Sequence, residues 1–169
     1  SYRIEIKGIQ DWAIDAGFMW MKMSIDEDSP MRLIRVVNHI IYDVDETDLH
    51  KAFMEEVLRN YIEAEAQRIL IAFLPRIMQY MTILPLFNGS ILRDKADRSF
   101  IPFNNGILEI KKNETIIHKY GDIDEFVFSR DIKDIDYVFG TSQGSFLDFI
   151  NIVTIDEEHI KFIKSVFGY

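Results

Sequence analysis

The sequence contains no cysteine, so neither a disulfide framework nor a thiolate zinc site can form, and a reducing compartment is expected. Only four prolines and eight glycines are present, which excludes collagen-like and low-complexity classes. No apolar run approaches the roughly 20 residues of a membrane-spanning helix, and no signal-peptide pattern is visible. With 48% hydrophobic residues, the 169-residue chain is expected to be a globular, cytoplasmic protein without a membrane contact.

The chain has fewer basic than acidic residues, with 19 Lys and Arg against 28 Asp and Glu, and its formal charge is -9. Phosphate binding depends on Lys and Arg, so the surface as a whole is not expected to hold nucleic acid. The charge is uneven, however. Residues 86–120 carry six basic and four acidic side chains, and both flanking stretches are acidic. Only this middle stretch is expected to face phosphate.

Signatures of metal and nucleotide sites are also missing. The chain has no Gly-x-x-x-x-Gly-Lys-Ser/Thr loop, so it is not expected to bind ATP phosphates in the P-loop manner. No metal-binding spacing relates the histidines to one another, and no catalytic triad follows from spacing. No cofactor or metal is therefore expected in this chain. The four histidines are His39, His50, His118 and His159.

Periodicity in the first half predicts strands followed by helices. Tyr2, Ile4 and Ile6 alternate with charged residues and predict an edge strand. A helix that begins at Asp11, within 11–23, is the alternative to a strand over 18–23. A hairpin is predicted over 18–23 and 31–44, an amphipathic helix over 45–60, and a second helix over 61–84 that is interrupted at Pro75.

The second half predicts a hairpin region followed by two helices. The turn signal Asn104-Asn105-Gly106 separates strands at 100–103 and 107–110, and short strands are expected over 115–120 and 125–129. Two helices are expected from Ser145 and from Thr154, the second with a capping-box spacing to Glu157. The order of elements predicts an α+β fold in one domain, 1–169, or one domain with lobes 1–85 and 86–169.

An apolar stretch that ends in Asp43-Val44-Asp45-Glu46-Thr47 resembles the first motif of the haloacid-dehalogenase-like phosphatases. That resemblance implies Asp43 as nucleophile and Asp45 as acid/base beside Mg²⁺, hence a small phosphohydrolase or phosphotransfer enzyme. The same two aspartates would also suit the metal-binding pair on the catalytic strand of a primase. The structural alternative is an acidic N-terminus of the following helix, capped by Asp45 or Thr47. The chain lacks the alternating strand and helix units of a parallel-sheet enzyme, which favours the structural alternative.

Basic and aromatic residues interleave between residues 93 and 120, which is typical of a single-strand-binding groove. The alternative is a solvated loop and turn, with the aromatic rings in the core and with interspersed acidic residues diluting the positive charge. The basic candidates are Arg93, Lys95, Arg98, Lys111, Lys112 and Lys119.

Two stretches together resemble the helicase-associated domain of phage, plasmid and poxvirus primase-helicases. The first is the hairpin of residues 101–110, which contains Phe103-Asn104-Asn105-Gly106-Ile107-Leu108. The second comprises 146–149 and 156–169, similar to the helix pair that in this family leads into the Walker A strand. Both ends of the chain are interpreted as boundaries within a longer protein.

The resemblance implies a non-catalytic accessory or linker domain that supports DNA replication. It implies a hexameric superfamily III, AAA-type ATPase motor downstream, with its own ATP and Mg²⁺, and often a primase upstream. The partner of this chain would then be the downstream ATPase domain of the same protein. Because the chain has a net negative charge, packing and assembly are expected to be its main role, and direct contact with DNA a secondary one.

Overall fold

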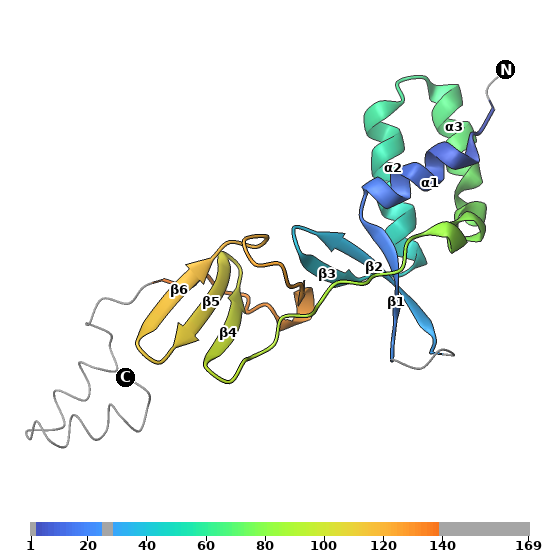
Figure 1. Ribbon diagram of the computed structural model, residues 1–169. Helices are drawn as coiled ribbons and strands as arrows, with labels where there is room; N and C mark the ends of the chain where they lie inside the picture. The colour runs from blue at the N-terminus through green and yellow to red at the C-terminus, as the bar shows by residue number, and fades with distance from the viewer. Residues whose placement is uncertain (1–2, 25–28, 139–169) are drawn as a thin grey trace, which may run out of the picture. The chain divides into compact units, whose positions relative to one another are not determined.

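The computed structural model describes residues 3–24 and 29–138 (Figure 1). Helices and antiparallel strands occur in separate stretches, which confirms the predicted α+β class. The chain divides into two compact units, 1–136 and 137–169, and nearly all described residues belong to the first. The predicted helices from Ser145 and Thr154 lie outside the described residues.

The first element is a helix, α1 (Ile6–Asp15), so the strand predicted over Tyr2, Ile4 and Ile6 is wrong. Ile9 and Ala13 are buried one helical turn apart and pack on the core. This packing favours a helix more than the short alternation of apolar and charged residues before Ile9 favours a strand. Gly17 ends the helix in a left-handed conformation, with φ of 88°. A Cβ at this position would lie 2.2 Å from the carbonyl oxygen of Val36, so only glycine permits this approach.

The predicted hairpin is present, with one strand more than expected. Strands β1 (Phe18–Lys22), β2 (Met31–Val37) and β3 (Ile40–Asp43) pair antiparallel in that order. The prediction of a single strand over 31–44 was wrong, because Asn38 and His39 both adopt positive φ, 49° and 62°, and form a tight turn. The turn lacks the glycine that usually marks such a reversal.

The predicted helix over 45–60 is confirmed as α2 (Glu46–Asn60). The Asp45 carboxylate accepts a hydrogen bond from the backbone N–H of Asp48, and the Asp48 carboxylate accepts one from Asp45. This capping box satisfies two N–H groups of the first turn. The break predicted at Pro75 is also confirmed, since α3 (Ala64–Phe73) gives way to the 3-10 helix η1 (Leu74–Ile83).

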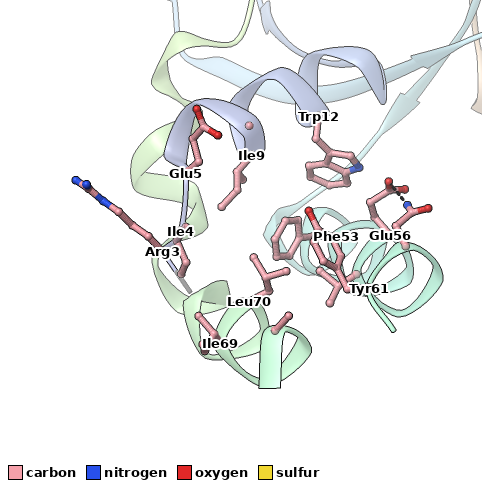
Figure 2. A pocket seen from close by; sticks show the side chains of 14 residues that line it. Arg3, Ile4, Glu5, Ile9, Trp12, Phe53, Glu56, Tyr61, Ile69 and Leu70 are labelled. Carbon is pink, nitrogen blue, oxygen red and sulfur yellow. Dashed lines mark hydrogen bonds between the residues drawn. The ribbon is translucent and has the colours of Figure 1, made fainter. Parts of the chain in front are cut away.

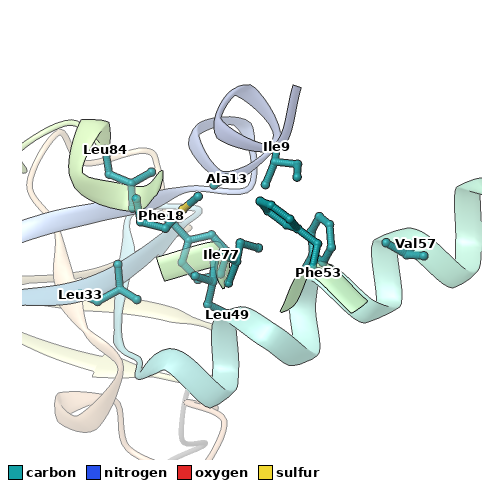
Figure 3. Packing of buried hydrophobic residues seen from close by; sticks show 11 residues of the cluster. Ile9, Ala13, Phe18, Leu33, Leu49, Phe53, Val57, Ile77 and Leu84 are labelled. Atoms are coloured by element: carbon teal, nitrogen blue, oxygen red, sulfur yellow. The ribbon is translucent and has the colours of Figure 1, made fainter. Parts of the chain in front are cut away.

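One apolar cluster joins the three α-helices, η1 and the β1–β2 hairpin (Figure 3). Trp12 packs edge-on against Phe53 with ring centroids 5.2 Å apart, and it also contacts Phe18. The indole of Trp20 donates a hydrogen bond to the carbonyl of Met81, which ties β1 to η1. The buried members of the cluster are Ile9, Ala13, Phe18, Leu33, Leu49, Phe53, Val57, Phe73, Ile77, Met81 and Leu84.

The second sheet contains β4 (Arg98–Phe103), β5 (Gly106–Lys111) and β6 (Glu114–His118), a meander that confirms the predicted hairpin region. Strand β7 (Val127–Phe128) then pairs in parallel with β3, and the short 3-10 turn η2 (Ser129–Asp131) follows. This pairing crosses the expected lobe boundary between residues 85 and 86. None of the helices within the described ranges has both the length and the apolar character to cross a bilayer.

We expect Leu49→Ala to lower the free energy of unfolding by about 2–5 kcal/mol, because the fully buried Leu49 leaves a cavity in the cluster. Leu58→Ala on the same helix is the matched control, since Leu58 is 58% exposed and should change stability by no more than about 0.5 kcal/mol. Urea unfolding followed by circular dichroism measures both. Equal losses would contradict the core described here.

Candidate functional site

The three α-helices surround an apolar groove with a cavity volume of about 360 Å³ (Figure 2). Trp12 and Phe53 line it from α1 and α2, and Leu70 lines it from α3. Ile69 also lines the groove and is only half-buried, so apolar surface remains in contact with water. An open apolar cavity of this size is typical of a binding site.

A second, more polar cavity of about 570 Å³ lies between α1 and α2 and shares Gly8, Trp12 and Glu56 with the groove. Five acidic side chains line the two cavities together, and within the described ranges none of them forms an ion pair. We call them the acidic rim. Its members are Glu5, Asp11, Asp15, Glu55 and Glu56.

Three basic residues, Arg3, Arg35 and Arg59, also line the cavities, but the first two are directed elsewhere. Figure 2 shows the Arg3 side chain pointing away from the other labelled side chains. The Arg35 guanidinium lies over the ring of Phe18, and its Nε donates to the carbonyl of Ala16 at 2.9 Å. The third, Arg59, lines the polar cavity and forms no ion pair within the described ranges, so the five carboxylates of the rim outnumber the cation directed toward them.

Gly8 stands in the first turn of α1, although glycine has a low helix propensity. Its φ is not positive, and a Cβ there would meet no atom within 4 Å, so the fold itself does not require glycine. Gly8 lines both cavities. The glycine therefore keeps open the space where groove and polar cavity meet.

Sequence reasoning missed this groove because it assigned the first residues to a strand. The spacing of Ile9, Trp12 and Ala13, three and four residues apart, was the available signal for a helix. The partly helical alternative beginning at Asp11 captured only the end of α1.

One face of the second sheet carries a charged network around Glu109, the single buried charged side chain among the described residues. Arg98 Nη1 donates to Glu109 Oε1 at 2.9 Å, and His118 Nε2 lies 2.8 Å from Oε2. Lys111 approaches at 3.5 Å. The hydrogen bond from His118, with the positive charges of Lys111 and Arg98, holds the pKa of Glu109 below its usual value despite burial.

In the part of the chain that the structure describes, the six basic candidates for nucleic-acid binding fall into two groups: three form ion pairs with carboxylates and three do not. Arg98 and Lys111 face each other on adjacent strands, but both pair with Glu109. Lys95 pairs with Glu125 at 3.1 Å. These ion pairs compete with phosphate for the three side chains. The other three, Arg93, Lys112 and Lys119, are exposed and form no ion pair within the described ranges.

The family-like residues form the β4–β5 hairpin. Phe103 pairs with Gly106 across a turn of Asn104 and Asn105, and Ile107 and Leu108 are buried in β5. A Cβ on Gly106 would lie 2.4 Å from the carbonyl oxygen of His118, so the position requires glycine.

The hairpin tip is tied down by its neighbours. The Tyr120 hydroxyl donates to the carbonyl of Phe103 at 2.7 Å, and burial raises the pKa of Tyr120 to about 12. The backbone N–H of Asn104 donates to the carbonyl of Ile135, and its side-chain amide donates to Asp134. The tip is thus a packed structural element.

Asp43 and Asp45 have different structural partners. Asp43 accepts hydrogen bonds from Arg32 at 2.7 Å and from Arg130 at 3.1 Å. Asp45 caps α2, and its hydrogen bonds to the backbone N–H groups of that helix hold its pKa below the ordinary value. Neither residue lines the two cavities described above.

Histidine geometry gives no metal centre within the described ranges, where no three His, Asp or Glu side chains are placed to share an ion. His39 stacks on Phe126 at 4.6 Å, and its Nδ1 is bonded to the carbonyl of Ile123. His50 lies 3.5 Å from Glu46. His159 lies outside the described residues.

No protein-family model matches the chain, and no curated protein matches its sequence.

We expect Glu109→Gln to be less stable than the wild type at neutral pH and to lose part of the acid sensitivity. The folded-state pKa of Glu109 is depressed below 4.5, so the carboxylate stabilises the fold above that pH, and this stabilisation is lost as pH falls through the depressed pKa. Urea unfolding from about pH 7 to pH 3 measures the difference. The exposed Glu114→Gln is the control, and superimposable profiles for all three proteins would contradict the network.

The capping role of Asp45 predicts a specific order of stability. Asp45→Asn and Asp45→Ser retain a side-chain acceptor for the N–H of Asp48 and should unfold near the wild-type temperature, whereas Asp45→Ala should unfold at a lower one. Thermal unfolding by circular dichroism makes the comparison. A wild-type Tm for Asp45→Ala would show that the cap contributes nothing.

Proposed function

We propose that this chain is a non-catalytic accessory domain of a phage- or plasmid-type DNA primase-helicase, which positions or assembles an ATPase motor downstream. The proposal joins two kinds of support. The sequence resemblance supplies the replication context, and the surface of the helical layer supplies the physical means of assembly.

The observation that carries the assembly role is the apolar groove. Its floor is contributed by three helices that also pack in the apolar cluster, so the groove is already formed without a partner. Exposed apolar side chains continue beyond it at the end of α2, where Leu58 is 58% and Ile62 is 97% exposed. Contacts between domains commonly use apolar surface of this kind.

The hairpin supports the replication context. Phe103 ends β4, Gly106 begins β5 directly after the turn, and Leu108 lies within β5, in the order expected from the resemblance. The turn is fixed by backbone contacts to Ile135 and by the hydroxyl of Tyr120, as befits a scaffold element.

The alternative phosphotransfer function finds less support. A nucleophilic Asp43 must approach a phosphate, whereas its carboxylate is engaged by Arg32 and Arg130. Asp45 has the role of a helix cap. The accessory role therefore agrees better with the partners of both carboxylates.

We expect the 169-residue chain to release no phosphate from ATP, and a longer form that continues past Tyr169 to hydrolyse it. Deleting residues 1–169 from the longer form should weaken its oligomerisation and lower turnover most at low protein concentration, because assembly is concentration-dependent. Phosphate release and light scattering measure the two effects. A Walker A Lys→Ala variant of the longer form is the control for contaminating ATPase.

Two results would overturn the proposal. One is a reading frame that stops at Tyr169 or continues without a phosphate-binding loop. The other is Mg²⁺-dependent phosphatase turnover by the chain alone that disappears in Asp43→Asn, which would establish the phosphotransfer alternative.

A further inference from the structure

The chemistry of the groove restricts what can fill it. All the secondary-structure elements that line it are helices, whose internal hydrogen bonds leave no row of backbone groups for an added strand. The rings of Trp12 and Phe53 meet edge to face at 5.2 Å, so there is no slot between them for a proline-rich segment. What remains is an apolar trough between helices, the geometry that accepts the apolar face of another helix.

The acidic rim restricts the charge of the occupant. Elsewhere in the described ranges, the carboxylates of Asp43, Glu109 and Glu125 are matched by Arg or Lys. Among the residues that the structure describes, no Arg or Lys forms an ion pair with the five rim carboxylates. An occupant with Lys or Arg beside its apolar face would complement them, whereas an acidic occupant would be repelled.

A second copy of this chain fits poorly. A twofold interface places the same patch on both subunits, so it would bring one acidic rim against the other. The chain as a whole carries a charge of -9, which adds to the repulsion. The charge favours a different surface as occupant.

We propose that the groove between α1, α2 and α3 is the docking site for a basic amphipathic helix of a partner protein or domain. Its apolar face lies on the half-buried Trp12, Ile69 and Leu70, and its Lys and Arg side chains meet the acidic rim. Gly8 leaves room for the close approach of the partner helix. This inference rests on the proposed assembly function and defines the chemistry of the partner.

The test uses the whole 169-residue chain and labelled synthetic peptides of about 15 residues, roughly four helical turns. Two peptides share one leucine stripe, with Lys flanks in the first and Glu flanks in the second, and a third is proline-rich. By fluorescence anisotropy, the Lys-flanked peptide should bind at least about tenfold more tightly than either other peptide at low salt. Its advantage should shrink as salt rises.

Variants locate the binding. Gly8→Leu adds a side chain at the open junction without removing any packing, and it should weaken the Lys-flanked peptide at least about tenfold, with Gly8→Ala, which adds a single methyl group, weakening it less. Ile69→Asp should weaken it similarly, because a charge enters the apolar floor. Ile135→Asp, at an exposed position outside the groove, is its control.

Charge-reversal variants distinguish the effect of the acidic rim on peptide binding from the effect of the chain's net charge. Asp11→Lys with Glu55→Lys should abolish the preference for Lys flanks, whereas Asp124→Lys with Asp136→Lys changes net charge equally and should preserve it. Circular dichroism of every variant confirms that it is folded.

Three outcomes would overturn the docking inference. They are equal binding of Lys- and Glu-flanked peptides, full binding by folded Gly8→Leu and Ile69→Asp, and self-association of the chain that Gly8→Leu abolishes, which would identify a second copy. Each is independent of the ATPase experiment. A missing downstream motor with intact peptide binding would overturn the replication role alone, and the reverse result would overturn only the docking site.

Discussion

Burial of one face of the β1–β2 hairpin against helices is the constraint on which the first unit depends. Phe18 and Leu33 meet Phe53 and Ile77 in a single cluster, so strands from the start of the chain and helices from residues 46–83 fold as one layer pair. The close contact of Gly17 with Val36 brings α1 onto this layer. The groove lies where residues of α1, α2 and α3 meet at the surface of this layer.

Charge is distributed in two distinct ways over the described residues. On the second sheet, Arg98, Lys111 and His118 satisfy a buried carboxylate, which removes basic charge from the surface and stabilises the sheet internally. Around the groove, the five carboxylates of the acidic rim form no ion pair within the described ranges. Unpaired charge beside apolar surface is a feature of recognition, because it selects the charge of a partner.

Prediction from sequence succeeded where the signal was local. The 45–60 helix combined a polar cap at Asp45 with apolar residues three and four apart, and Pro75 interrupted a helix by removing an N–H. Asn104-Asn105-Gly106 marked a turn by its composition. It failed at the N-terminus, where a short alternation competed with a helical stripe, and at Asn38-His39, whose left-handed turn has no glycine to reveal it.

The sequence alone therefore determined the α+β class, the central helix with its cap, the hairpins and the absence of a P-loop, because each depends on neighbours along the chain. Tertiary structure alone decided that α1 is a helix, that Glu109 neutralises Arg98 and Lys111, and that an apolar groove with an acidic rim opens between three helices. These features arise from contacts between residues distant in sequence. Local periodicity and composition carry no information about which of those residues meet.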